Sequence, residues 1–112
     1  MHLVGEAGDA ASGRLVAAGD VRVQTRQTLE SLRLGLEALG GRMDDIVKTN
    51  VTLADHRLIP AFDDEYRAFF TPPYPARTTV VAGLAQEPLL IETEAVAVLG
   101  ATDDAIAVTG AA

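Results

Sequence analysis

Apolar residues recur along the chain with two different periods, and the period separates predicted helices from predicted strands. From Asp20 to Gly40 they are spaced by three or four residues, which predicts an amphipathic helix with Asp20 as its N-cap and the Gly40-Gly41 pair at its end. The same spacing predicts a second helix from about Leu58 to Phe70, with Pro60 in its first turn. The apolar stripes of the two helices are Thr25, Leu29, Leu32, Leu36 and Leu39 in the first, and Ile59, Phe62, Tyr66, Phe69 and Phe70 in the second.

Runs rich in β-branched residues predict strands at 46–53, from residue 77 to about 82, and from about 89 to 99. Shorter apolar segments at Leu3-Val4 and at 14–17 predict two further short strands near the start. Side chains alternate across a strand, so each strand has two faces. In 46–53 we expect one face to carry Val47, Thr49, Val51 and Leu53, and the other, more polar face to carry Ile46, Lys48, Asn50 and Thr52.

The predicted order is β-β-α-β-α-β-β, which is typical of an α+β domain. Helical crossovers between strands predict a mixed sheet with both helices on one face. The gap at 83–88 is short enough for an antiparallel hairpin between the last two strands. We interpret residues 1–99 as one domain and 100–112 as a loose tail, in which 105–108 is a candidate for one more short strand.

Composition bears on the partners of the chain. Hydrophobic residues make up 48% of its 112 residues and aromatic residues only 4%. Surplus apolar surface in a small domain often lies in subunit contacts, so we expect a homo-oligomer, with an Ala-rich monomer as the alternative. A net charge of −7 disfavours nucleic acid as a partner. The sequence has no cysteine and no apolar run long enough to span a membrane, and we expect a cytoplasmic protein.

Ionisable residues in the last two predicted strands are the candidates for chemistry. Arg77 opens one strand, and Glu92 and Glu94 share a face of the next. A guanidinium can grip a carboxylate through two parallel hydrogen bonds, and a carboxylate can orient or deprotonate water. A structural ion pair for Arg77 and a solvated face for the two glutamates are the alternatives, and these residue types alone do not decide between them.

The remaining polar and aromatic candidates have simpler interpretations. We expect His56 to be a surface residue in a turn, and Tyr66 to belong to the core. Adjacent aspartates such as Asp63-Asp64 do not have the spacing of a metal-binding loop, so helix capping or contact with solvent is the expected role. No metal site and no nucleophile are predicted.

Five short motifs occur in a fixed order between about residues 13 and 99. They are QTRQTL at 24–29, DIVKT at 45–49, FDDEYRAFF at 62–70, PART at 75–78 and IETEAVA at 91–97. In this order and spacing the chain resembles the RidA/YjgF (reactive intermediate deaminase) family.

The resemblance implies a chorismate-mutase-like fold and a homotrimer with a central β-barrel and clefts between subunits. It implies hydrolysis of 2-imino and enamine acids to 2-keto acids and ammonia, as by a 2-iminobutanoate/2-iminopropanoate deaminase, without a cofactor. Carried over by position, Arg77 matches the residue that binds the substrate carboxylate, and Glu92 the residue that positions the attacking water. The backbone carbonyl of Thr79 matches one that shares this water, and Gly5 matches a glycine that lines the pocket.

The chain departs from the family pattern near its start. Family members usually have Ser-Gly-Gln where this chain has Val4-Gly5-Glu6, and they begin with an additional strand whose aromatic residue covers the substrate. We expect that first strand to be missing. The alternative function is therefore a non-catalytic module on the same trimer that binds a keto acid or a partner. A ribonuclease, a role sometimes attached to relatives, is disfavoured by the net charge.

Overall fold

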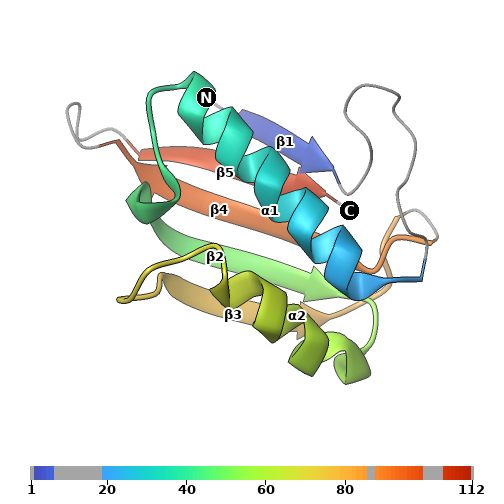
Figure 1. Ribbon diagram of the computed structural model, residues 1–112. Coiled ribbons are helices and arrows are strands. Elements are labelled where there is room, and N and C mark those ends of the chain that lie inside the picture. Colours follow the sequence, from blue (N-terminus) through green and yellow to red (C-terminus); the bar gives the residue numbers. More distant parts are fainter. Residues whose placement is uncertain (1, 7–18, 86–87, 100–104, 112) are drawn as a thin grey trace.

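Two α-helices lie on one face of a five-stranded sheet in the computed structural model (Figure 1). The structure describes residues 2–6, 19–85, 88–99 and 105–111, with backbone alone for the first and last of these ranges. The helices are α1 (Val21–Ala38) and α2 (Ile59–Arg67). The strands are β1 (His2–Glu6), β2 (Ile46–Leu53), β3 (Ala76–Val81), β4 (Ile91–Val98) and β5 (Ala105–Ala111).

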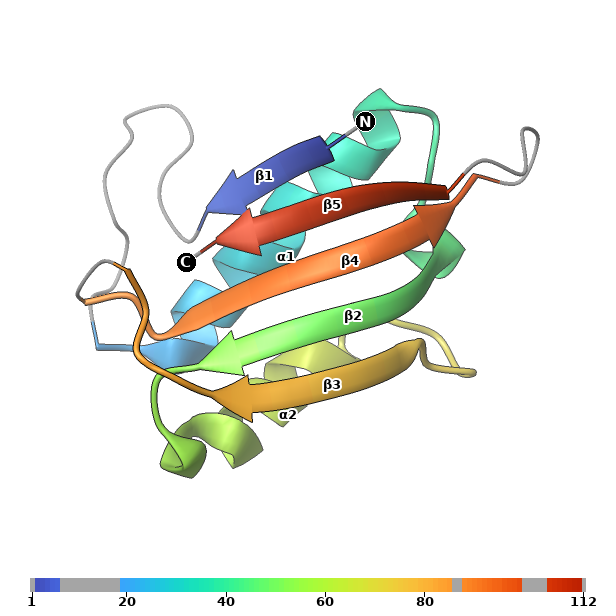
Figure 2. The ribbon, with the colours of Figure 1, turned by 180° about the vertical axis from the view of Figure 1, so that it is seen from behind.

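The sheet is mixed, with the strand order β1-β5-β4-β2-β3. β2 runs parallel to β3 and antiparallel to β4, whereas β5 runs antiparallel to β4 and parallel to β1. α1 lies over the β5–β4 side and α2 over the β2–β3 side, so the opposite face of the sheet carries no described helix (Figure 2). The predicted α+β architecture with both helices on one face is confirmed.

The predicted hairpin between the last two strands of the domain is wrong. β3 and β4 run in opposite directions, but β2 lies between them and pairs with both. The chain after Val81 therefore crosses the end of β2 before it enters β4. A short connection is compatible with both arrangements, and hydrophobic pattern alone does not identify the neighbour of a strand.

The prediction of a loose tail also needs correction. Residues 105–111 form β5, longer than the candidate strand at 105–108, and β5 lies between β4 and β1 within the sheet. The alternation of small residues in this segment is weak, which is why its period did not reveal a strand. The strand predicted at 14–17 lies outside the described residues.

A bulge at the start of β2 changes which residues face the core. Ile46 is opposite Ala97 and Lys48 is opposite Val96, so Val47 is an extra residue in the ladder. As a result Ile46 is buried and Val47 is half exposed, the reverse of the predicted faces at this end. From Thr49 onward the predicted alternation is confirmed, with Thr49, Val51 and Leu53 buried.

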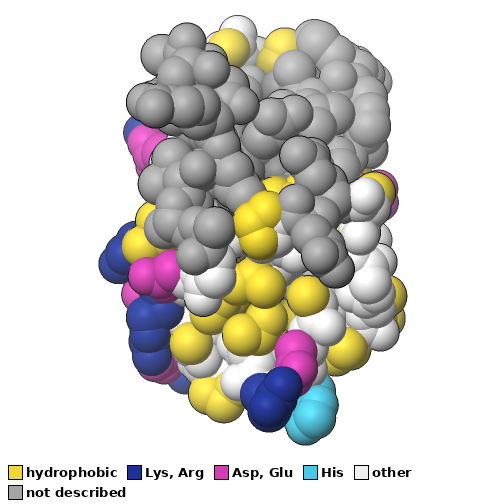
Figure 3. All heavy atoms as spheres, turned by 90° about the vertical axis from the view of Figure 1, so that its right-hand side faces the viewer, with side chains coloured by type: hydrophobic (Ala, Val, Ile, Leu, Met, Phe, Trp, Pro, Cys, Tyr) yellow, Lys and Arg dark blue, Asp and Glu magenta, His cyan; other side chains and the backbone are white. Residues whose placement is uncertain are grey.

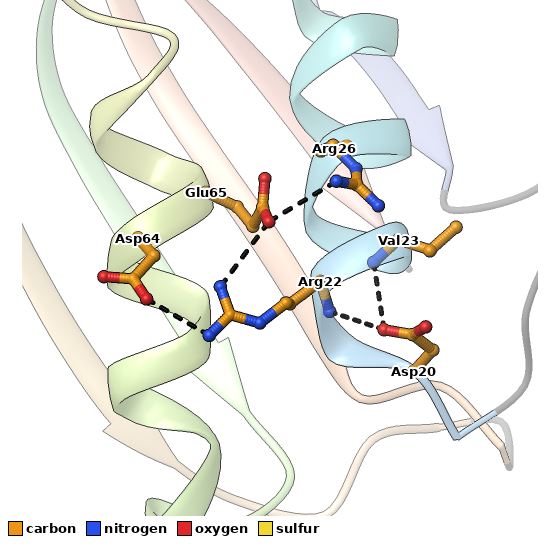
Figure 4. A network of polar contacts seen from close by, with 6 residues as sticks. All are labelled: Asp20, Arg22, Val23, Arg26, Asp64 and Glu65. Atoms are coloured by element: carbon orange, nitrogen blue, oxygen red, sulfur yellow. Dashed lines mark hydrogen bonds and ion pairs between the residues drawn. The ribbon is translucent and has the colours of Figure 1, made fainter.

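The ends of α1 follow the sequence prediction. The Asp20 carboxylate accepts hydrogen bonds from the backbone N–H groups of Arg22 and Val23, and so caps the helix (Figure 4). Beyond the last turn, Gly40 has φ +82°, a left-handed conformation that glycine adopts without strain. Neither α1 nor any other described helix is long and apolar enough to cross a membrane.

An ion-pair network joins the two helices. Arg22 of α1 lies 3.1 Å from Asp64 and 3.6 Å from Glu65 of α2, and Arg26 lies 3.4 Å from Glu65 (Figure 4). The arginine side chains are about half exposed, so each pair contributes at most about 1 kcal/mol. The network fixes which face of α2 turns toward α1, and Asp63 lies on a different face, toward β3.

The core fills the space between the helices and the sheet. α1 contributes the predicted stripe of Leu29, Leu32 and Leu36, all at most 1% exposed, and α2 contributes Phe62 and Tyr66. Further core residues from the strands and turns are Met43, Ile46, Val51, Leu53, Phe70, Ile91, Ala95 and Ala97.

A buried hydrogen bond joins α2 to β2. The hydroxyl oxygens of Tyr66 and Thr49 lie 2.8 Å apart, and Thr49 is fully buried. The substitution Tyr66→Phe leaves the Thr49 hydroxyl without this partner, so we expect a loss of about 1–3 kcal/mol in the free energy of unfolding. Urea unfolding at a fixed protein concentration measures it. Tyr74→Phe is the matched control, because Tyr74 is 49% exposed and its loss should change stability by less than about 0.5 kcal/mol.

Candidate functional site

Arg77 lies between the edge of the sheet and α2. On β3 it is the neighbour of Thr49, which faces the helices, so its side chain points to the same side. Its guanidinium carbon lies 5.2 Å from the centroid of the Phe62 ring and 4.9 Å from that of Tyr66. A guanidinium over two aromatic rings gains about 0.5–2 kcal/mol from each favourable contact, depending on how far it is desolvated. The rings therefore hold the cation in place.

Asp63 provides the counter-charge. Its Oδ1 lies 2.8 Å from Nη2 of Arg77, and the two side chains are only 21% and 27% exposed. This oxygen is enclosed and accepts no hydrogen bond of good geometry from the described part of the chain. Its close polar contact is the ion pair with Arg77. A buried acceptor without a hydrogen bond is costly. The close approach of the Arg77 guanidinium therefore offsets part of the cost of enclosing this oxygen.

A pocket of about 230 Å³ opens beside this ion pair. α2 lines it with three side chains from one side of the helix, at spacings of three and four residues from Asp63, and the loop before β3 and the start of β3 line the rest. Arg67 has no ion-pair partner among the residues described, so two arginines and one aspartate give the pocket a net charge of +1. Such a pocket attracts small anions. The lining residues are Asp63, Tyr66, Arg67, Tyr74, Pro75 and Arg77.

Tyr66 remains a neutral phenol in this setting. Burial raises its pKa, and the nearby Asp63 charge acts in the same direction. The hydrogen bond with Thr49 and the charge of Arg77 oppose the increase without cancelling it. Tyr66 is therefore poorly suited to act as a base near neutral pH, and it acts as a platform for Arg77.

Glu92 lies on the other face of the sheet. In β4, exposed Glu92 and Glu94 alternate with buried Ile91, Thr93 and Ala95, which face the helices. The neighbour of Glu92 on β2 is Thr52, and Nδ2 of Asn50 lies 3.5 Å from Oε1 of Glu94. The structure therefore does not bring Arg77 and Glu92 together within one protomer.

The other two predicted site residues lie at opposite edges of the sheet. Thr79 is on β3, two residues beyond Arg77 and on the same strand face. Gly5 is on β1, where its backbone pairs with Gly110 of β5. Three strands separate β1 from β3. Only Arg77 and Thr79, of the four predicted residues, are brought together in a single chain.

The sequence interpretation missed Asp63 and Arg67. The adjacent Asp63 and Asp64 were expected to have the same role, but they occupy different helix faces, with Asp64 paired to Arg22 and Asp63 to Arg77. The available signal was the spacing of Asp63, Tyr66 and Arg67, which puts all three on one side of α2. The described residues hold no group of three His, Cys, Asp or Glu side chains that could bind a metal.

Comparison with known proteins gives consistent matches. The family described as endoribonuclease L-PSP matches residues 1–99. A 2-iminobutanoate/2-iminopropanoate deaminase from Dermatophagoides farinae is 31% identical over 101 residues, which are 88% of this chain and 77% of that protein. The YjgF gene product of Escherichia coli is 34% identical, with 78% of this chain and 69% of that chain covered and a TM-score of 0.70. TdcF of Escherichia coli, solved with bound serine, is 29% identical, with 80% and 72% covered and a TM-score of 0.73.

Proposed function

This chain belongs to the RidA/YjgF family, also described as the endoribonuclease L-PSP family, and we propose that it hydrolyses small 2-imino acids to 2-keto acids and ammonia. The observation that carries the proposal is Arg77, held over two aromatic rings at the wall of a small, positively charged pocket. The relative named as a deaminase and the relative solved with serine support a small ligand that bears a carboxylate.

Arg77 has the chemistry to bind that carboxylate. A guanidinium has five N–H donors, and the ion pair with Asp63 engages one end of it. Donors that remain can meet a carboxylate in a planar, two-bonded arrangement that fixes the direction of the substrate. The aromatic contacts keep the cation from moving as the ligand binds, so the orientation costs little conformational entropy.

The hydrolysis itself needs few groups. Water attacks the carbon of the C=N bond, and Glu92 accepts a proton from that water, while the backbone carbonyl of Thr79 accepts a hydrogen bond from it. The resulting carbinolamine takes a proton on nitrogen and expels ammonia, which leaves the C=O bond of a 2-keto acid. Because a protonated imine is already electrophilic, orientation and one placed water supply most of what the reaction requires.

The geometry of one chain supports an assembly of several. Arg77 lies at the β3 edge, Glu92 on the helix-free face and Gly5 at the β1 edge, so a complete site requires residues from different protomers. A head-to-tail contact that closes into a ring gives one such site at each interface, and we propose the homotrimer of the family. Apolar side chains gather at the end of the molecule where β2 and β3 finish (Figure 3), and Val80 and Val81 are each 49% exposed there.

A turnover assay tests the proposal. An amino-acid oxidase with catalase converts D-alanine to 2-iminopropanoate, and semicarbazide competes for the imine before water hydrolyses it. The expected result is faster release of pyruvate and ammonia, and less semicarbazide adduct, as the protein is added. An unchanged rate at any protein concentration would contradict the proposal. If pyruvate still binds, the protein is a non-catalytic binding module.

A further inference from the structure

Asp63 presents a difficulty for a pocket that binds a simple anion. Its carboxylate lies 2.8 Å from the guanidinium that would bind the ligand, and it is only 21% exposed. Bringing a second carboxylate to Arg77 therefore places two like charges close together at low exposure, which costs affinity. If the pocket bound only anions, Asp63 would act against its function.

A ligand that carries one positive and one negative charge removes the difficulty. We propose that Asp63 is a specificity-determining residue that accepts a hydrogen bond from a cationic nitrogen of the ligand, so that the pocket selects zwitterions over simple anions. The ligand carboxylate then binds Arg77 and Arg67, and the N–H group of the ligand meets Asp63, which lines the same pocket. The inference rests on the proposed function for the identity of the substrate, because a protonated 2-imino acid is such a zwitterion.

Two observations besides the ion pair support this role. Asp63 lines the pocket and its side chain is 21% exposed, so a ligand in the pocket can meet this side chain. Arg67 lines the same pocket one turn along α2. With Asp63 committed to the nitrogen, the two arginines remain for the carboxylate, so each charge of the ligand meets a charge of opposite sign on the pocket wall.

The consequence for turnover is a preference for substrate over product. Hydrolysis converts the zwitterion, with its cationic nitrogen, into a 2-keto acid that has only the carboxylate. The product therefore loses the contact with Asp63 and gains the repulsion described above. Product release is favoured by the same residue that favours substrate binding.

Binding of stable ligands tests the inference without turnover. The probes are L-alanine, a zwitterion, and pyruvate, an anion, titrated by calorimetry into the purified protein and into Asp63→Asn. We expect Asp63→Asn to bind pyruvate more tightly and L-alanine more weakly, and to shift the ratio of the two Kd values by about tenfold or more. The control is Asp64→Asn, which removes the same charge at the neighbouring position but faces Arg22 of α1, and it should leave the ratio unchanged.

The ratio separates specificity from a structural role. If Asp63 only orients Arg77, the substitution changes both Kd values by the same factor and the inference is overturned. The same holds if the wild-type protein binds pyruvate but not L-alanine. If Asp63→Asn does not fold, Asp63→Ser provides the same ratio with a smaller uncharged side chain. Failure of the proposed function appears instead as absent imine hydrolysis with the ratio shift intact.

Discussion

Replacing Arg77 by alanine is expected to lower kcat/KM for 2-iminopropanoate by roughly a hundredfold or more, mainly through KM, because truncating a partly buried charge that pairs with the ligand costs about 2–5 kcal/mol. Arg77→Lys should recover only part of this loss, since an ammonium keeps the charge but not the planar pair of hydrogen bonds. Steady-state kinetics with the oxidase-coupled assay measures both variants.

A second arginine gives the control. Arg57 is 80% exposed and pairs with Asp55 in the turn before α2, away from the pocket. Arg57→Ala should leave kcat/KM close to the wild-type value. Equal kinetics for Arg77→Ala and the wild type would remove Arg77 from ligand binding. A loss that disappears when the folded fraction is corrected for by circular dichroism would assign Arg77 a structural role on Phe62 and Tyr66.

Replacing Glu92 by glutamine is expected to lower kcat by about a hundredfold while KM changes little, because a general base contributes about 10²–10⁴-fold to the rate. Glutamine keeps the size of the side chain and its capacity to hold water by hydrogen bonds, but it does not accept the proton. Single-turnover measurements separate this chemical step from product release.

Glu94 is the matched control for Glu92. It lies two residues further along β4, on the same helix-free face, and it is exposed in the same way. Glu94→Gln removes an equal charge from an equivalent position, next to Asn50, and should leave kcat within about twofold if only Glu92 meets the water. A greater loss for Glu94→Gln than for Glu92→Gln would exchange the roles of the two carboxylates.

Local patterns were sufficient to predict the helices and their faces. The three- and four-residue spacing of apolar positions identified the buried side of α1, and the Asp20 cap and Gly40 marked its ends. The same spacing identified Phe62 and Tyr66 as the buried face of α2. These features depend on neighbours within one or two helical turns, so they can be predicted from a single sequence.

The same local patterns did not predict which strands pair with one another in the sheet. The position of β2 between β3 and β4, and the entry of β5 into the sheet, depend on contacts between residues far apart in the chain. The bulge that turns Val47 outward depends on the register of β2 against β4. Arg77 and Glu92 were predicted as residue types, but their opposite sheet faces follow from this strand pairing. The separate role of Asp63 follows from the packing of α2 against β3, which brings Asp63 to Arg77.

We propose that Arg77 of one protomer and Glu92 of another complete each site. Co-expression of Arg77→Ala and Glu92→Gln chains with different affinity tags, followed by isolation of hybrids with both tags, tests it most directly. With equal amounts and random assembly into closed rings, about one quarter of the interfaces carry both native side chains, so the unselected mixture should recover about one quarter of the wild-type kcat. Hybrids that carry both tags and yet show no activity above either parent would contradict the shared site.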